Sequence, residues 1–302
     1  MRVRDFFKAY YKLSKMGIVF FAILTSSFSY MLSLPDFSFF ALENFVWFCI
    51  AFYFVCSGSF ILNQAQEGSL DEKMKRTFCR PIPQGQISLY QAYLLAGFFL
   101  FIGHVLLLLI QVQTALLSLI TVVLYNLFYT LWWKKKLSYG AVLGAIPGAM
   151  PPVIGYSLSG GDIFSTQSMY LFLLLFFWQM PHFWSLAIHY KKDYKRAGFP
   201  ILPVMRGNSQ TLYQIGFYLL AYLGLALSSP LFLRAGLMYV FLLVPFALIL
   251  FYQFYKYFYN PKNWLPFFLW VNMSILVYFC VPILDKWIFQ SVVKYQLSLV
   301  GL

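Results

Sequence analysis

Long apolar stretches alternate with short polar segments along the whole chain. Each stretch approaches the roughly 20 residues that a helix needs to cross the hydrocarbon core of a bilayer. We predict about nine transmembrane helices, at 17–34, 41–62, 88–110, 114–132, 139–158, 168–189, 212–230, 236–255 and 264–284. No segment between them is long enough for a soluble domain, so we expect residues 1–302 to form a single integral-membrane domain of the all-α polytopic class.

The composition supports a protein that resides in the lipid bilayer. Apolar residues make up 61% of the chain and charged residues 10%, whereas soluble domains have about 45–50% and about 25%. Soluble globular and disordered proteins are therefore excluded as classes. The four cysteines form no CxxC pair, and three lie in apolar stretches, so neither a metal centre nor a disulfide framework is predicted from them.

The basic residues predict an orientation in the membrane. All 22 Lys and Arg residues except Arg234, Lys286 and Lys294 lie in the N-terminal segment or after the second, fourth, sixth and eighth stretches. Because basic residues favour the cytoplasmic side, we expect the basic segment 1–16 and the loops 63–87 and 190–211 to be cytoplasmic and the C-terminus to lie outside. The net charge of +13 is then a consequence of topology, and no nucleic-acid partner is expected.

The first long loop combines acidic and basic residues, in the string NQAQEGSLDEKMKRTFCRPIPQG. Asn63, Glu67 and Asp71 are spaced four residues apart, which places them on one face of a helix. Oxygen ligands suit Mg²⁺, which is often held by one or two carboxylates together with substrate phosphates. Three cations that suit phosphate follow: Lys75, Arg76 and Arg80. The pattern suits a metal diphosphate as ligand, and it equally suits a solvated loop with ion pairs between residues four positions apart.

A second unusual segment, 144–155, reads GAIPGAMPPVIG in the middle of a hydrophobic stretch. Gly and Pro at this density interrupt a helix, which a membrane protein tolerates where the freed backbone lies in protein or lines a cavity. The segment therefore predicts either a kinked helix whose small residues allow close packing or a broken helix that shapes a substrate cavity.

These segments resemble a known family. The string from Asn63 to Ser88 is similar to the first signature of the UbiA superfamily of intramembrane prenyltransferases, and more narrowly to that of the protoheme IX farnesyltransferases, or haem O synthases. Seven positions match: Asn63, Asp71, Met74, Arg76, Thr77, Arg80 and Pro81. Glu67 stands where the family has Asp. The strings GAMPPVIG and WQMPHFW…DY..AG.P.LPV resemble the same family, so the similarity covers about residues 60–210.

The resemblance implies a UbiA-type helical bundle in the cell (inner) membrane with a cytoplasmic active site. The implied reaction transfers a farnesyl group from farnesyl diphosphate to a vinyl group of haem B, giving haem O and diphosphate. Mg²⁺ is the implied cofactor, and handover of haem O to a haem A synthase or a terminal oxidase assembly is an implied further step. Two alternatives stay open: a UbiA-type enzyme acting on a quinone precursor, and a membrane transporter.

The resemblance also implies roles for individual residues. Asn63, Glu67 and Asp71 are the expected catalytic metal ligands, and Asp193 is expected to support a second metal or to position a basic group. The expected diphosphate-binding residues are Lys75, Arg76, Arg80, Lys192 and Lys195. The expected haem-binding residues are His182, Trp178, Trp184 and Tyr129. His104 and His189 are interpreted as structural.

Overall fold

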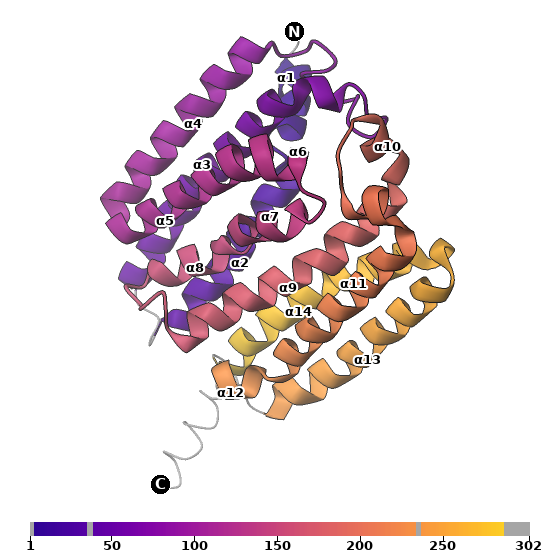
Figure 1. The fold of residues 1–302 in the computed structure, drawn as a ribbon. Coiled ribbons are helices and arrows are strands. Elements are labelled where there is room, and N and C mark those ends of the chain that lie inside the picture. The colour runs from indigo at the N-terminus through magenta and orange to yellow at the C-terminus, as the bar shows by residue number, and fades with distance from the viewer. Residues whose placement is uncertain (1–2, 35–38, 234–236, 287–302) are drawn as a thin grey trace, which may run out of the picture.

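The computed structural model describes residues 3–34, 39–233 and 237–286, and over these residues every regular element is a helix (Figure 1). The predicted all-α class is confirmed. Arg234 and Lys294, which contributed to the predicted orientation, lie outside the described residues.

Seven helical segments in the described part of the chain are long and apolar enough to cross a membrane. They are α2 (Met16–Ser33), most of α3 (Phe39–Asp71), α4 (Leu89–Ile110), the run Val112–Lys136, α9 (Thr166–His189), most of α13 (Leu237–Tyr259), and α14 (Trp264–Leu284) with the 3₁₀ turn η2 (Pro261–Asn263) before it. The run Val112–Lys136 combines α5 (Val112–Val123), the π-helical η1 (Leu124–Trp133) and α6 (Lys134–Lys136).

The predicted number of about nine crossings is approximate, because two of the apolar stretches differ from a plain spanning helix. Stretch 139–158 is divided at Ala149 into α7 (Gly140–Gly148) and α8 (Met150–Ser157). Stretch 212–230 lies mainly in α11 (Leu202–Leu227), whose first turns include the polar segment 206–210 and a kink at Gly207. The short helices are α1 (Val3–Leu13), α10 (Lys191–Arg196) and α12 (Ser229–Leu233).

Helix α3 extends further than the apolar pattern predicts. It continues to Asp71 instead of ending near residue 62, so the first part of the expected loop 63–87 is helical. Its 33 residues correspond to about 50 Å at the usual rise per residue, whereas a hydrocarbon core is about 30 Å thick. A helix of this length projects beyond the hydrocarbon core.

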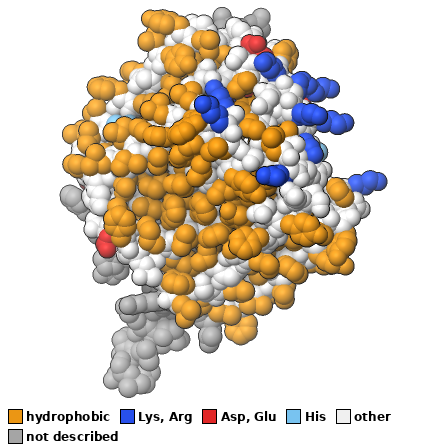
Figure 2. All heavy atoms as spheres, in the orientation of Figure 1, with side chains coloured by type: hydrophobic (Ala, Val, Ile, Leu, Met, Phe, Trp, Pro, Cys, Tyr) orange, Lys and Arg blue, Asp and Glu red, His pale blue; other side chains and the backbone are white. Residues whose placement is uncertain are grey.

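The helices form two groups with a third between them. In Figure 1, α3, α4 and α5 lie on one side, α9, α11, α13 and α14 lie on the other, and α2, α7 and α8 run between them. A large hydrophobic core joins α9, α11, α13 and α14, with Trp184 and Tyr222 among its fully buried side chains. Hydrophobic side chains cover most of the face in Figure 2, whereas Lys and Arg gather at one end, around α6 and α10. This distribution is that of a multi-pass membrane protein.

The broken helix α7–α8 packs closely against α2. A Cβ atom added at Gly155 would lie only 2.0 Å from the Ser26 carbonyl oxygen, so the backbones touch at this point. We therefore expect Gly155→Ala to destabilise the protein by about 1–3 kcal/mol through overpacking. Thermal unfolding in detergent measures the effect.

The control for this prediction is Gly97→Ala in α4, where an added Cβ has nothing within 4 Å. An apparent Tm for Gly155→Ala equal to that of this control would contradict the close packing of α8 on α2.

Candidate active site

A cavity of about 600 Å³ lies between the helix groups. Its polar end is lined by three side chains of α3, Asn63, Glu67 and Asp71. Its apolar part is lined by residues of α2, α5, η1, α7, α8 and α9, including Phe21, Tyr125 and several others. The broken helix contributes to this wall, which is one of the two alternatives that the sequence predicted. The shape therefore offers one polar end and one long apolar region.

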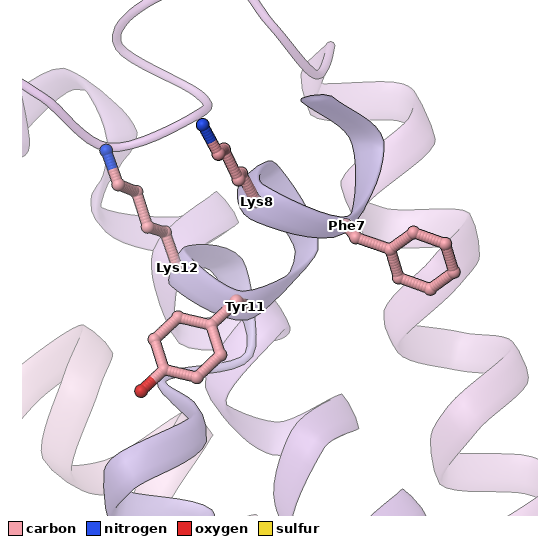
Figure 3. A pocket seen from close by; sticks show the side chains of 4 residues that line it. All are labelled: Phe7, Lys8, Tyr11 and Lys12. Carbon is pink, nitrogen blue, oxygen red and sulfur yellow. The ribbon is translucent and has the colours of Figure 1, made fainter. Parts of the chain in front are cut away.

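A shallower depression lies on the outside of α1 (Figure 3). It is lined by Phe7, Lys8, Tyr11 and Lys12, and Figure 3 shows the two lysine side chains pointing to the same side of the helix. These four residues belong to a single helix and include no carboxylate. This depression therefore lacks the groups that a metal diphosphate needs.

Asn63, Glu67 and Asp71 occupy successive turns at the end of α3. All three side chains are at least 98% buried, and all three line the cavity. The predicted alignment on one helical face is confirmed. Because α3 extends to Asp71 as a continuous helix, these three side chains have a rigid backbone.

Each of these three side chains contacts a cation from another part of the chain. The Lys15 Nζ donates a hydrogen bond to Asn63 Oδ1. The Lys134 Nζ lies 2.7 and 2.8 Å from the two carboxylate oxygens of Glu67. The third contact is an ion pair in which Arg80 Nη1 lies 2.6 Å from Asp71 Oδ2.

Lys15 reaches the cavity through an unusual backbone conformation. It lies between α1 and α2 with φ 52° and ψ 51°, a left-handed conformation that is uncommon for a residue other than glycine. The Gln64 Nε2 fixes this junction by donating to the carbonyl oxygens of Lys12 and Leu13. Burial lowers the pKa of Lys15 to about 7, and the positive charge of Arg80 acts in the same direction. An anion in the cavity would favour the charged form of this amine.

Lys134 is the first residue of α6 and directly follows the π-helical segment η1. A π-helix is a rare geometry that is frequent at functional sites. The rings of Tyr125 and Tyr129 in this segment stack with centroids 5.7 Å apart, and both line the cavity. Thr130 Oγ1 accepts a hydrogen bond from Asn63 Nδ2 at 3.0 Å. The segment therefore fixes Asn63 as well as presenting Lys134 to Glu67.

The sequence pattern does not identify Lys15 or Lys134 as site residues, because membrane topology accounts for both charges. Lys134 lies within the range 60–210 over which the chain resembles the family, and this is a usable signal. Lys15 is 48 positions from its partner Asn63, and no local pattern connects the two residues.

Arg76 and Asp193 link the turns after α3 to α10. The backbone N–H of Arg76 donates to Asp193 Oδ2 at 3.1 Å, and its guanidinium Nη2 lies 3.3 Å from the Tyr194 hydroxyl. The guanidinium carbon also lies 5.1 Å from the centre of the Tyr190 ring. Arg76 lines the cavity, whereas Asp193 does not, and its other oxygen is 3.7 Å from Arg196. Both oxygens of Asp193 are thus directed to protein groups.

The remaining predicted diphosphate residues lie outside the cavity. The side chains of Lys75, Lys192 and Lys195 are exposed, and none lines the cavity. Arg76 and Arg80 are the predicted cations that the structure brings to it.

The predicted haem-binding residues are only partly brought together. The imidazole of His182 stacks on Trp178, with ring centroids 4.8 Å apart, and lies tilted against the Phe268 ring, with centroids 5.0 Å apart. His182, Trp178 and Tyr129 line the cavity, whereas Trp184 is fully buried in the core and does not. His104 and His189 do not line it either.

The donor set at the end of α3 fits a hard divalent cation. It consists of two carboxylates and one amide. Among the described residues, no group of three or more His, Cys, Asp or Glu side chains is placed to hold a metal ion. Asp71 Oδ1 is buried and has no hydrogen-bond partner among the residues that the structure describes. An ion such as Mg²⁺ would use these oxygens and complete its coordination with water and phosphate.

Comparisons with known proteins place the chain in a family. The UbiA prenyltransferase family matches residues 19–276. A protoheme IX farnesyltransferase of Bdellovibrio bacteriovorus is 43% identical over 93% of this chain and 97% of its own length. One of Roseiflexus castenholzii is 35% identical over 77% of this chain and 43% of its own length.

Solved structures of low sequence identity share the fold. A digeranylgeranylglyceryl phosphate synthase has a TM-score of 0.72 at 18% identity, over 92% of this chain and 98% of its own. A UbiA homologue from Archaeoglobus fulgidus bound to GPP and Mg²⁺ has a TM-score of 0.60 at 18% identity, over 91% and 99%. The chain therefore belongs to the UbiA prenyltransferase family, among the protoheme IX farnesyltransferases.

Proposed function

We propose that the chain transfers a farnesyl group from farnesyl diphosphate to a vinyl group of haem B, giving haem O and diphosphate. The observation that carries this proposal is a buried cluster of Asn63, Glu67 and Asp71, surrounded by cations, at one end of an apolar cavity. Such a cluster suits a metal diphosphate, and the apolar region suits a prenyl chain. The acceptor is supported by the relative from Bdellovibrio bacteriovorus.

The residues at the polar end would stabilise the leaving group. Asn63, Glu67 and Asp71 would hold Mg²⁺, which when bound supplies positive charge against the diphosphate oxygens. Four cations line the same cavity: Lys15, Arg76, Arg80 and Lys134. As the allylic C–O bond breaks, negative charge accumulates on the diphosphate, and cations that contact its oxygens in a buried site would stabilise that charge.

The aromatic residues beside this cluster would act on the farnesyl group. The stacked rings of Tyr125 and Tyr129 line the cavity, and aromatic faces attract a cation. The vinyl carbon of haem attacks the allylic cation, forming the new C–C bond. Water then adds to the resulting carbocation and loses a proton, which gives the hydroxyl group of haem O.

His182 is the proposed contact to the haem iron, flanked by Trp178 and with Trp184 supporting the helix from the core. A neutral imidazole is a common axial ligand. We expect His182→Gln to weaken haem binding about tenfold or more, with little change in the affinity for farnesyl diphosphate. Titration of the haem absorption band measures it.

His189→Gln is the matched control for this substitution, because His189 does not line the cavity. Unchanged haem affinity and an unchanged haem spectrum in His182→Gln would remove the iron contact.

Asp193 is proposed to position Arg76, since its oxygens are directed to Arg76 and Arg196. We expect Asp193→Asn to raise the KM for farnesyl diphosphate less than about tenfold and to leave the Mg²⁺ concentration for half-maximal activity unchanged. Asp193→Ala, which removes the acceptor, should raise KM further. A large rise in the Mg²⁺ requirement of Asp193→Asn would instead identify a second metal site.

The exposed lysines Lys75, Lys192 and Lys195 have a proposed long-range role. Positive charges near a cleft raise the rate at which an anion arrives, in a salt-dependent manner. The same charges, with those of α1 and α6, support the proposal that this end of the bundle faces the cytoplasm. We also propose that the product, haem O, is delivered to a haem A synthase or to a terminal oxidase assembly.

The deciding experiment uses a host that lacks its own haem O synthase. Haem is extracted from membranes that contain this chain and is analysed by chromatography and mass. We expect haem with a hydroxyethylfarnesyl group, and none from the Asp71→Asn variant. Haem B alone, with the protein expressed and farnesyl diphosphate present, would reject haem as acceptor and favour a quinone precursor.

A further inference from the structure

The three proposed metal ligands are all engaged by cations in the structure. Lys15 contacts Asn63, Lys134 contacts both oxygens of Glu67, and Arg80 contacts Asp71. The pairing is one to one along successive turns of α3. The same cations are the groups that suit the oxygens of a diphosphate.

This pairing gives each buried carboxylate of the site a cation as its partner. A buried carboxylate without a partner is strongly destabilising, and Glu67 and Asp71 are both at least 98% buried. The cations thus neutralise both buried carboxylates. They also occupy Asn63 Oδ1, both oxygens of Glu67 and one oxygen of Asp71. While these pairs persist, those oxygens are not available to a metal ion and the cations are not available to a diphosphate.

We propose that Mg²⁺ and the diphosphate enter this site by an exchange of partners. The oxygens of Asn63, Glu67 and Asp71 would hold the metal, which would supply positive charge in place of the three cations. The three displaced cations would move to the oxygens of the diphosphate. This inference rests on the proposed function, because it assumes that the ligand is a metal diphosphate. It adds that the two ligands bind interdependently.

The two ligands bind interdependently because either ligand alone would leave buried charged side chains without a partner of opposite charge. Mg²⁺ alone separates cations from α3 and leaves them buried without an anion. The diphosphate alone draws cations away and leaves the carboxylates unpaired. With both ligands present every charge has a partner, so each ligand strengthens the binding of the other by the same factor.

The side chains have the freedom that the exchange requires. Lys15 and Lys134 have flexible four-carbon stems, with the charge at the end of the stem, and both line the cavity. Asp71 presents one oxygen to Arg80, while its Oδ1 has no hydrogen-bond partner among the described residues. That oxygen offers the metal a first contact before any pair is broken.

The test measures binding rather than turnover, on the full-length protein in nanodiscs. Mn²⁺ serves as a paramagnetic substitute for Mg²⁺, and its free fraction is read by electron paramagnetic resonance without any diphosphate present. We expect Lys134→Met to bind Mn²⁺ about tenfold more tightly than the wild type, because the competing cation of Glu67 is gone. Lys135→Met, which alters a lysine that does not line the cavity, should match the wild type.

The second measurement uses labelled farnesyl thiodiphosphate, with and without Mg²⁺. We expect Mg²⁺ to strengthen its binding to the wild type about tenfold or more, and this factor to shrink in Lys134→Met. Lys15→Met provides a second variant with the same expectation, should Lys134→Met fail to fold. Mn²⁺ affinity that is unchanged or weaker in a folded variant overturns the exchange.

These binding measurements test the exchange separately from the proposed transfer of farnesyl to haem. If the wild type forms haem O but Lys134→Met and Lys15→Met bind Mn²⁺ with unchanged affinity, the exchange is rejected and the proposed reaction stands. Tighter Mn²⁺ binding together with no farnesylated haem supports the exchange and rejects haem as the acceptor.

Discussion

Asp71→Asn should abolish haem O formation, with a loss of at least about a hundredfold, while the protein stays folded in the membrane. The substitution keeps the shape of the side chain but removes its charge. It thereby weakens the proposed metal site and leaves Arg80, 2.6 Å away, without an ionic partner. Haem O is quantified by mass spectrometry per amount of purified protein.

The control for Asp71→Asn is Glu72→Gln, which removes a carboxylate from the next residue. Glu72 is exposed and does not line the cavity, so its variant should retain normal activity. Normal haem O formation in both variants would exclude Asp71 from the metal site. Loss of haem O formation in both variants would indicate that activity depends on the total charge of this segment and not on Asp71 as a metal ligand.

Lys134→Met should lower both stability and activity. It leaves the buried carboxylate of Glu67 without its cation, a change that costs about 3–5 kcal/mol when a buried pair is broken. It also removes a proposed ligand of the diphosphate, so we expect at least about a hundredfold loss of turnover. Thermal unfolding and haem O formation measure the two effects separately.

A double variant distinguishes the two roles of Lys134. In Glu67→Gln with Lys134→Met the charge of the carboxylate is also gone, so most of the lost stability should return. Turnover should remain low, because both the metal ligand and the cation are missing. If the double variant regains activity along with stability, the pair is purely structural. Lys135→Met should match the wild type in both measurements.

The hydrophobic pattern predicted most helices because a spanning segment is recognised from its own composition. The positions of α2, α4 and α9 agree with the apolar stretches, since in lipid each backbone satisfies its own hydrogen bonds. The end of α3 was misjudged, because its last turns are polar. Those turns are helical because they are buried against other elements, including the cations that contact them.

The membrane class, the family resemblance and the alignment of Asn63, Glu67 and Asp71 could be predicted from the amino-acid sequence, because each depends on residues that are close along the chain. The cations that contact these three side chains could not be predicted in this way. Lys15 and Lys134 lie 48 and 67 positions from their partners, and Lys75, only four positions from Asp71, points to solvent. The packing of α1, α2, α3 and α6 selects the partners, because contacts between distant segments depend on the fold and leave no periodic signal in the sequence.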